Sequence, residues 1–219
     1  MTTFKLGELF CGPGGIAYGA INAKIEKPEY KIEHVWANDY DSDTCETYRH
    51  NICPDSPESV ICGDVRKLDI EELSPIDALA FGFTCNDFSQ VEEQKGINGT
   101  FGTLDTYGVK ALKKFQPSWF LAENVGGLRS ANEGSAFKQI LHDLREVGYN
   151  IYPHLYKFEE YGVPQSRHRI IIIGIRNDLP YVFSPPDPKD YKHLFKTSKE
   201  ALENPPIPFD ASNNEITKQ

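Results

Sequence analysis

The stretch KLGELFCGPGGIAYGAINAKI, residues 5–25, contains the strongest indication of the fold. Its first six residues are mostly apolar and predict a short buried strand over 5–10. The glycine-rich CGPGG follows at 11–15, and the next ten residues predict a helix. A strand that turns through glycines into a helix lets a ligand approach the backbone at a helix N-terminus. A tight turn without any ligand would use the same residues, so this stretch alone leaves both readings open.

The rest of the chain continues the alternation of strands and helices. Apolar runs predict further strands at 32–39, 59–64, 76–81, 117–124 and 169–175, and helical spacing marks 41–51, 106–115 and 135–148. Residues 149–158 predict an outer strand, because Pro153 could not donate a hydrogen bond inside a central ladder. The alternation predicts an α/β fold with a mostly parallel sheet and helices on both faces.

Composition indicates a globular protein outside the membrane. The chain has 219 residues, of which 39% are hydrophobic and 25% charged. No apolar run approaches the roughly 18 residues of a membrane helix, and the N-terminus lacks the pattern of a signal peptide. We therefore expect a cytoplasmic protein without a membrane partner. Its net charge of −9 is unlike that of a domain that holds a DNA duplex alone.

The five cysteines do not form a recognisable metal or disulfide pattern. None has CxxC spacing and their number is odd, so we expect neither a disulfide framework nor a metal site. A buried inert thiol is the ordinary role of such a residue. They are Cys11, Cys45, Cys53, Cys62 and Cys85.

Two segments differ in character from the alternating pattern. Residues 84–102 are polar, without periodicity, and predict a long loop of the kind that is often functional. Seven prolines lie between Arg176 and Pro208, Pro208 included, and this segment shows no strong periodic pattern of apolar residues. We therefore predict one α/β domain over 1–176, which would carry the functional site, and a proline-rich connector or tail over 177–219.

Acids follow two of the predicted strands. Asp39 ends the second strand and could accept two ribose hydroxyls, while Asp64 ends the third and could accept from an adenine amino group. Tyr40 could stack on the base. Each acid alone could be a helix cap, but with the glycine turn they predict an adenosine site at the carboxyl edge of the sheet. Because CGPGG is not GxGxxG, S-adenosylmethionine fits this site as well as a nicotinamide cofactor or better.

A cysteine lies beside the same predicted edge. In GFTCNDFSQ, residues 82–90, Cys85 follows the strand 76–81 at once. Glu123 lies in AENV, residues 122–125, at the end of the strand 117–124, and Arg167 and Arg169 stand at the start of the last strong strand. A thiol, a carboxyl group and two guanidiniums at one edge favour a nucleophilic Cys85 over an inert thiol or a metal ligand.

These residues carry a resemblance to the DNA (cytosine-5)-methyltransferases. LFCGPGG, GFTCNDFS, AENV and GVPQSRHRI resemble four motifs of that family and occur in its order, over about residues 4–176. The resemblance implies a Rossmann-like methyltransferase fold, S-adenosylmethionine as cofactor, S-adenosylhomocysteine as product, and double-stranded DNA with a flipped cytosine as partner. No metal is implied. The family positions for the cofactor fall on Phe10, Gly12, Gly14, Asp39, Tyr40, Asp64, Val65 and Leu104.

The resemblance also implies a covalent mechanism. Cys85 would add at C6 of cytosine, so that C5 could attack the sulfonium methyl. Glu123 would donate a proton to N3, and it would do so best if desolvation raised its pKa. Arg169 would stabilise the carbonyl oxygen. Arg167 would position the thiol or its loop, which would close over the flipped base. Core packing is an alternative role for Phe10, Val65 and Leu104.

The sequence departs from the family in two ways. Thr84 stands where proline usually precedes the cysteine, which could loosen the placement of the thiol. No target-recognition region or later family motif is recognisable, so a second chain would supply them, as in two-subunit members, or the chain is truncated. We keep as alternatives a non-catalytic regulatory remnant, a tRNA-methylating relative and, more distantly, a nicotinamide oxidoreductase. A bacterial or phage restriction-modification protein would fit, but the DNA target is not readable.

Overall fold

The structure is a computed structural model that describes residues 2–23, 30–82, 105–125 and 135–203. The described strands are β1 (Thr2–Leu9), β2 (Tyr30–Asp39), β3 (Val60–Cys62), β4 (Ala78–Gly82), β5 (Trp119–Val125), β6 (Tyr149–Lys157) and β7 (His168–Arg176). The described helices are α1 (Gly15–Ile21), α2 (Ser42–Ile52), α3 (Asp105–Phe115), α4 (Ser135–Glu146) and α5 (Ser198–Glu203). Short 3₁₀ turns are η1 (Pro57–Ser59), η2 (Val65–Lys67), η3 (Ile70–Glu72), η8 (Phe158–Tyr161) and η9 (Pro188–Leu194). No helix in these ranges is long and apolar enough to cross a membrane.

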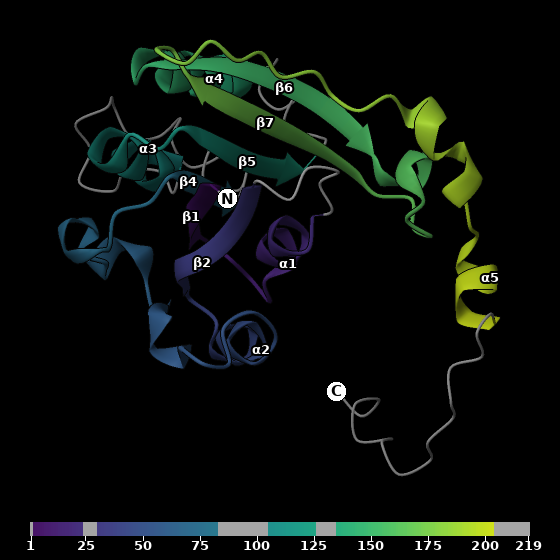
Figure 1. Ribbon diagram of the computed structural model, residues 1–219, viewed down its shortest axis with the longest axis horizontal. Helices are drawn as coiled ribbons and strands as arrows, with labels where there is room; N and C mark the ends of the chain where they lie inside the picture. The colour runs from purple at the N-terminus through teal and green to yellow at the C-terminus, as the bar shows by residue number, and fades with distance from the viewer. Residues whose placement is uncertain (1, 24–29, 83–104, 126–134, 204–219) are drawn as a thin grey trace. The chain divides into compact units, whose positions relative to one another are not determined.

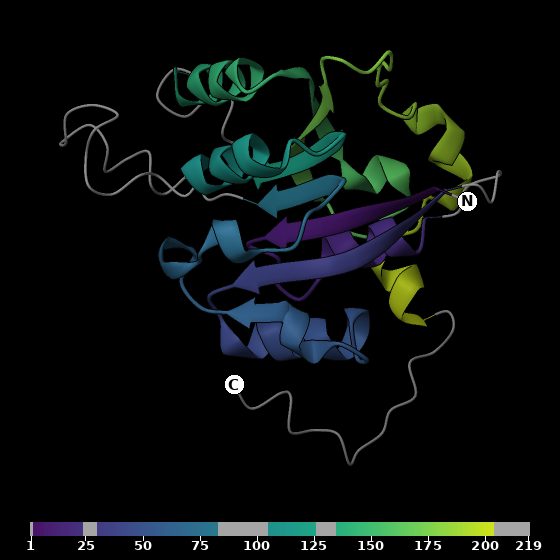
Figure 2. The ribbon, with the colours of Figure 1, turned by 60° about the vertical axis from the view of Figure 1, so that its left-hand side comes forward.

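The seven strands form one sheet in the order β3-β2-β1-β4-β5-β7-β6. The pairs from β3 through β5 are all parallel, and Figure 1 shows the arrow of β7 running against its neighbours. The chain moves outward from β1 to β3 and then returns to β4 on the other side of β1. Ligands of open α/β sheets bind at such a switch point, outside the carboxyl ends of the strands. Figure 2 shows the arrowheads of β1, β2 and β4 ending on one side.

Alternate residues of the strands pack into two separate hydrophobic clusters, one on each face of the sheet. Leu79 and Phe81 of β4 belong to a cluster with Leu112 of α3 and Leu144 of α4. Their neighbours Ala78 and Ala80 belong to a cluster with residues of α1 and α2. Figure 1 shows these two pairs of helices on either side of the sheet. Burial on both faces explains why the strands are continuous apolar runs, and it confirms the predicted α/β fold.

The predicted elements agree with the structure, with bounds that differ by a few residues. Pro153 lies in β6, the last strand of the sheet order, as its missing amide requires. Asp41 is the N-cap of α2, where its carboxylate accepts a hydrogen bond from Thr44 N at 2.8 Å. Helix α5 was not predicted, because a helix of six residues has too few turns to show periodicity. The predicted loop 84–102 lies outside the described residues.

The chain divides into two compact units. The first is Met1–Leu155 with Ile170–Ser184, and the second is Tyr156–Arg169 with Pro185–Gln219. Inside the second unit, Ser198 donates to the backbone oxygen of Pro164 at 2.7 Å, and Tyr161 donates to that of Pro186 at 3.1 Å. The domain boundary predicted at residue 176 stays a prediction.

Candidate active site

The turn after β1 combines strain with open space. Phe10 adopts a φ of 56°, which is unusual for a residue with a side chain, and Gly12 adopts 54°. A Cβ built on Gly12 would meet nothing within 4 Å, so a ligand could approach this backbone closely. Gly14 differs, because a Cβ there would lie 2.8 Å from the side chain of Ile52 and 3.0 Å from that of Tyr48. Gly12 therefore leaves space above the turn, and Gly14 lets α2 pack beneath it.

Asp39 ties the end of β2 to this turn. Its Oδ2 accepts a hydrogen bond from the amide of Gly12 at 2.7 Å, and its Oδ1 accepts one from Asp41 N at 3.1 Å. The buried Asn38 accepts from Cys11 N through its backbone oxygen and donates from its side chain to Ile61 O at 2.8 Å. A carboxylate has about four acceptor positions, so Asp39 can still accept hydrogen bonds from a ligand.

Asp64 is the N-cap of η2, just beyond β3, and its carboxylate is already paired with a basic side chain. It accepts from Arg66 N at 2.9 Å and forms an ion pair with the Arg66 guanidinium at 2.6 Å. These hydrogen bonds lower the pKa of Asp64 to about 2. Val65 is only 3% exposed and packs in the core, so a ligand there would meet its backbone. Tyr40 is 79% exposed, which leaves its ring available for stacking.

Glu123 lies near the end of β5, next to the end of β4, and β4 lies between β5 and β1. A Cβ built on Gly82 would be 3.8 Å from Oε2 of Glu123 and 3.8 Å from the backbone oxygen of Phe10. The pairing of Gly82 with Glu123 in the parallel ladder produces this proximity. The structure thus places the Glu123 carboxylate and the backbone oxygen of Phe10, which precedes the glycine turn, both close to Gly82. Cys85 and Leu104 lie outside the described residues, and Cys85 follows Gly82 by three positions.

Arg167 and Arg169 belong to the second unit, where Glu159, an acid that the sequence analysis did not single out, binds residues 167 and 168. Glu159 accepts from the amide of Arg167 at 3.2 Å and pairs with Nε2 of His168 at 2.7 Å. The hydrogen bond from its own backbone amide, followed by those from His168 and Arg167, lowers the pKa of Glu159 to about 2. Arg169 is half-buried and donates to His168 O at 2.8 Å. The meeting of these guanidiniums with Glu123 stays a prediction.

Sequence reasoning also missed a buried polar group beneath the turn. Glu8 is 1% exposed, and its Oε2 lies 3.0 Å from the hydroxyl of Tyr48. The same hydroxyl lies 3.1 Å from Nδ1 of His34, whose Nε2 lies 2.7 Å from Oγ of Ser59. The signal was present in LGELF, where Glu8 interrupts an apolar strand. An acid at such a position needs a buried partner.

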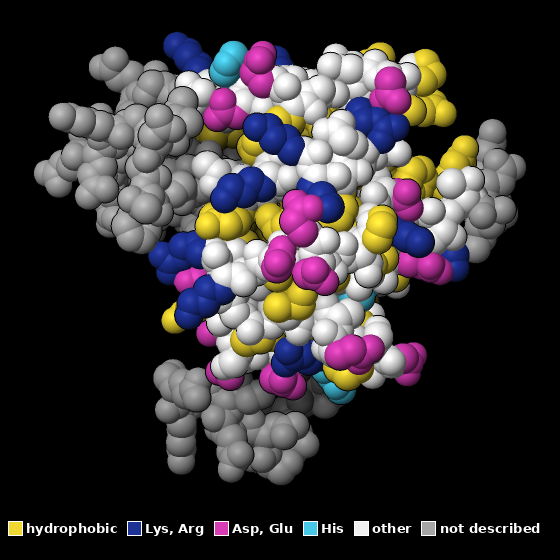
Figure 3. Space-filling model, turned by 90° about the vertical axis from the view of Figure 1, so that its left-hand side faces the viewer, with side chains coloured by type: hydrophobic (Ala, Val, Ile, Leu, Met, Phe, Trp, Pro, Cys, Tyr) yellow, Lys and Arg dark blue, Asp and Glu magenta, His cyan; other side chains and the backbone are white. Residues whose placement is uncertain are grey.

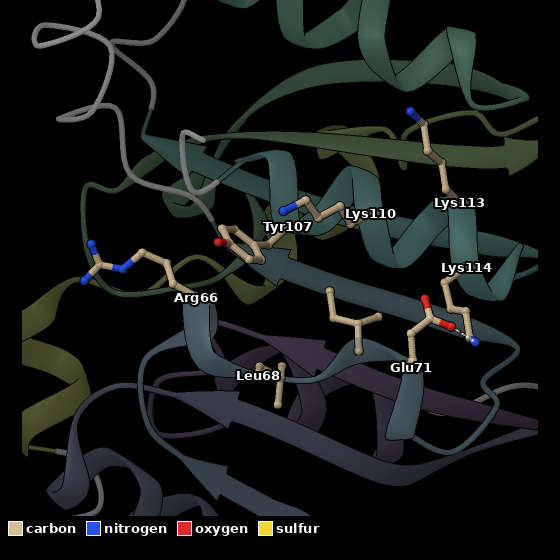
Figure 4. Close-up of a pocket in the computed structure, with 8 residues that line it drawn as sticks. Arg66, Leu68, Glu71, Tyr107, Lys110, Lys113 and Lys114 are labelled. Carbon is tan, nitrogen blue, oxygen red and sulfur yellow. Dashed lines mark hydrogen bonds and ion pairs between the residues drawn. The ribbon is translucent and has the colours of Figure 1, made fainter. Parts of the chain in front are cut away.

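A shallow groove of about 520 Å³ lies beside Asp64, between η2, η3 and α3 (Figure 4). Several of its cations already have acidic or aromatic neighbours: Lys114 pairs with Glu71, and Lys110 lies 4.3 Å from the ring centre of Tyr107. Figure 3 shows Lys and Arg side chains interspersed with Asp and Glu on that view of the surface. The groove therefore does not resemble an anion site.

The thiols of the described cysteines are free, and Cys11, Cys45 and Cys53 are buried. Burial raises the pKa of Cys45 to about 12 and raises the pKa of Cys11 further. Both thiols therefore fit the inert role expected of them. Within the described ranges no three His, Cys, Asp or Glu side chains are grouped so as to hold a metal ion.

Comparison with known proteins identifies the family. The family described as "C-5 cytosine-specific DNA methylase" matches residues 4–218. The Type II methyltransferase M.BbvI of Brevibacillus brevis is 56% identical over 226 residues, which cover 98% of this chain and 60% of that protein. The Type II methyltransferase M.NgoFVII of Neisseria gonorrhoeae is 34% identical over 222 residues, covering 98% and 56%. The chain thus spans less than two thirds of the length of these relatives.

Solved structures agree on the fold. The Dnmt2 methyltransferase of S. pombe superposes with a TM-score of 0.63 at 19% identity, covering 96% of this chain and 58% of that one. The DNMT2 of Spodoptera frugiperda gives a TM-score of 0.66 at 21% identity, covering 84% and 53%. Both support the Rossmann-like methyltransferase architecture of the sheet described above.

Proposed function

Because the chain belongs to the C-5 cytosine-specific DNA methylase family, we propose that it transfers a methyl group from S-adenosylmethionine to C5 of cytosine in DNA. The observation that carries this proposal is the convergence of three strand ends. Gly12 and Asp39 are joined by a hydrogen bond of 2.7 Å, and the Glu123 carboxylate lies close to Gly82 at the end of β4, the strand next to β1. A nucleoside site and a catalytic carboxyl group would thus share one edge.

The residues of this edge fit an adenosyl cofactor. The open space above Gly12 would admit it, Asp39 would accept from the ribose, and Asp64 from the adenine amino group. Asp64 would then exchange or share its pairing with Arg66. The ring of Tyr40 would lie against the base. When bound, S-adenosylmethionine supplies an electrophilic methyl group.

The chain's own residues would activate the cytosine. The thiolate of Cys85 would form a bond to C6, while Glu123 donates a proton to N3 and so neutralises the charge that the addition places on the ring. The neutral ring that results is an enamine whose C5 is nucleophilic and takes up the methyl group. After methylation a base removes the C5 proton, the C6–S bond breaks, the thiolate leaves and N3 returns its proton to the Glu123 carboxylate. Arg169 would stabilise the carbonyl oxygen and Arg167 the loop that carries Cys85. The target base must be flipped out of the duplex to reach this edge.

Target recognition would come from elsewhere than the described fold. A chain of net charge −9 needs a basic companion to hold DNA. The relatives M.BbvI and M.NgoFVII are longer, which supports a further part of the same polypeptide as the reader. A second subunit would serve equally well. The names of these relatives support a role in a bacterial restriction-modification system. A cytoplasmic location is part of the same proposal.

A non-catalytic cofactor-binding remnant is the second candidate. Thr84, in place of the usual proline, favours it. The retained Cys85, Glu123 and Arg169 favour the enzyme. A remnant would bind S-adenosylhomocysteine and never methylate DNA, so turnover separates the two.

The test is Glu123→Gln, with Glu146→Gln on the exposed end of α4 as the matched control. Transfer of tritiated methyl groups into duplex DNA is measured with the protein and any partner it requires. We expect Glu123→Gln to lower the rate by about 10²-fold, the usual contribution of a general acid, with unchanged affinity for S-adenosylhomocysteine. Equal rates for Glu123→Gln and Glu146→Gln would contradict the role of Glu123.

A further inference from the structure

Beneath the glycine turn a chain of hydrogen bonds joins four elements of the first unit. It runs from Glu8 on β1 to Tyr48 on α2, then to His34 on β2 and to Ser59 in η1. It ends where Oγ of Ser59 lies 2.6 Å from the backbone oxygen of Ser56. Because Glu8, Tyr48 and His34 have no evident role in the chemistry proposed above, their arrangement calls for another explanation.

An irregularity in β2 places His34 in this series of hydrogen bonds. Leu6 pairs with His34 but Gly7 pairs with Trp36, so β2 has one extra residue at this point. Val35 and Trp36 both pack in the cluster that contains α3 and α4. Without the bulge, His34 would share the face of Trp36 rather than that of Tyr48.

The direction of the hydrogen bonds can be derived from the end of the chain. The carbonyl oxygen of Ser56 can only accept, so the hydroxyl proton of Ser59 is committed to it. Nε2 of His34 must then donate to Ser59 Oγ. Nδ1 of His34 is left either as an acceptor in a neutral ring or as a donor in a charged one.

Only two proton arrangements satisfy every remaining contact. In the first, Glu8 is protonated and donates to Tyr48, and Tyr48 donates to Nδ1 of His34. In the second, Glu8 is ionised, Tyr48 donates to it, and His34 is a cation that donates to Tyr48. Both arrangements contain the same number of protons and have no net charge. They differ in whether the shared proton resides on the acid or on the imidazole.

Burial favours the first arrangement, in which neither Glu8 nor His34 carries a charge. It raises the pKa of Glu8 to about 8 and lowers the pKa of His34 to about 4. The nearby charge of Asp39 raises the pKa of Glu8 further, whereas the hydrogen bond of Tyr48 lowers it. In the described part of the protein, the other titratable groups that face these hydrogen bonds are the thiols of Cys11 in the turn and Cys53 at the end of α2. They are neutral at pH 7, so they do not reverse the preference.

The chain of hydrogen bonds touches the cofactor edge at two points. The ring of Tyr48 lies where a side chain on Gly14 would be, 3.0 Å from the position of its Cβ. Glu8 interacts electrostatically with Asp39, which holds the amide of Gly12. We infer that Glu8, Tyr48 and His34 share one proton in an uncharged network, and that this network positions the glycine turn to bind the cofactor. The second part of the inference rests on the proposed function.

The proton arrangement can be tested on the unaltered protein. Nitrogen-15 NMR distinguishes the two tautomers of a neutral imidazole from its cation, and His34→Asn assigns the signal. At pH 7 we expect His34 to be neutral, with its proton on Nε2. A proton on Nδ1, in either the neutral ring or the cation, would overturn the uncharged network.

The positioning role is tested by binding of S-adenosylhomocysteine between pH 6.5 and 9.5. Ionisation of Glu8 removes the donor that Tyr48 needs, so we expect affinity in the unaltered protein to fall several-fold above pH 8. Glu8→Gln retains a neutral donor, and its affinity should lack that fall. The ligand's own titration is common to all variants and cancels in the comparison.

Tyr48→Phe and Tyr149→Phe form a matched pair. Tyr149 is also buried, and its hydroxyl donates to Pro117 O at 2.8 Å in the opposite core. We expect Tyr48→Phe to weaken binding at least five-fold at pH 7, and Tyr149→Phe to leave both affinity and pH profile unchanged. Identical pH profiles for Glu8→Gln and the unaltered protein would overturn the inference. Absence of binding by the unaltered protein at every pH would instead defeat the proposed function.

Discussion

The carboxylate of Asp39 and the amide of Gly12 are joined by a hydrogen bond of 2.7 Å, although 27 residues separate them in the sequence. This bond connects the acid at the end of β2 to the open position of the glycine turn. It fixes the orientation of the carboxylate that we propose to bind a ribose.

Asp39→Asn should weaken the binding of S-adenosylhomocysteine. The amide places an NH₂ group where one carboxylate oxygen now accepts from Gly12 N or Asp41 N, and it removes the charge from the acceptor. Hydrogen bonds to charged groups contribute about 1.5–3 kcal/mol, so we expect affinity to fall by about 10- to 100-fold. Calorimetric titration measures this change. Asp41→Asn keeps an equally good N-cap and is the control; equal losses in both variants would contradict a specific role for Asp39.

Gly14→Ala should mainly reduce folding stability, whereas Gly12→Ala should mainly reduce cofactor affinity. Both glycines have positive φ, but only at Gly14 would the new Cβ collide with Ile52 and Tyr48. We expect Gly14→Ala to lower the free energy of unfolding by about 1–3 kcal/mol, through overpacking and backbone strain. Gly12→Ala should lower it less and should reduce cofactor affinity at least ten-fold, because its methyl group occupies the open space. Urea unfolding and calorimetric titration separate the two effects, and a reversed order would contradict this division of roles.

Asp64→Asn should change which base the cofactor site prefers. If Asp64 accepts from the adenine amino group, S-adenosylhomocysteine should bind about ten-fold more tightly than S-inosylhomocysteine, which lacks that group. Asparagine preserves the N-cap of η2 and should lose most of this preference. The ratio of the two dissociation constants is the measurement. A ratio unchanged by the substitution would place the adenine elsewhere.

The pair Glu8 and His34 should give folding stability a characteristic pH dependence. The pKa of Glu8 rises from 4.5 to about 8 on folding, and that of His34 falls from 6.5 to about 4. Between about pH 4.5 and 6.5 the unfolded chain binds the pair's proton on His34 and the folded chain binds it on Glu8, so the pair adds no slope. From about pH 6.5 to 8 the folded state binds more protons, and stability is lost as pH rises. Below about pH 4.5 the unfolded state binds more, and stability is lost as pH falls.

Glu8→Gln isolates the contribution of His34 in the same measurement. The variant should gain stability with pH from about pH 4 to 6.5, where the unfolded His34 loses its proton, and the pair should add no slope above that range. Relative to the unaltered protein, Glu8→Gln should therefore become progressively more stable between about pH 4.5 and 8. Urea unfolding at half-unit pH intervals measures the difference, and a constant difference would contradict the raised pKa of Glu8.

Much of the fold was predictable because the strands are buried on both faces. Runs such as IDALAF and RIIIIGI are apolar throughout, as a central parallel strand requires, and α4 is long enough to show its helical spacing. The register was not predictable. The extra residue in β2 has no signature in IEHVWAND, since Val35 and Trp36 are apolar in any register.

The candidate site was predictable where residues stand at strand ends, and less so where function depends on distant partners. Asp39, Asp64 and Glu123 follow apolar strands, and the structure places all three at the carboxyl ends of β2, β3 and β5 or just beyond them. The distinction between Gly12 and Gly14 could not be read, because it depends on the packing of α2. Glu8 and its hydrogen-bond partner Tyr48 are 40 residues apart in the sequence. The only indication of this contact in the sequence was the acid that interrupts an apolar strand.

The central claim, methylation of cytosine C5 through a bond to Cys85, is tested most directly by identifying the nucleoside that receives the methyl group. DNA treated with the protein, any partner it requires and labelled S-adenosylmethionine is digested and separated by chromatography. We predict that all label elutes as 5-methyldeoxycytidine, and that Cys85→Ala abolishes it while S-adenosylhomocysteine still binds. Label in any other nucleoside, or unchanged methylation by Cys85→Ala, would contradict the account.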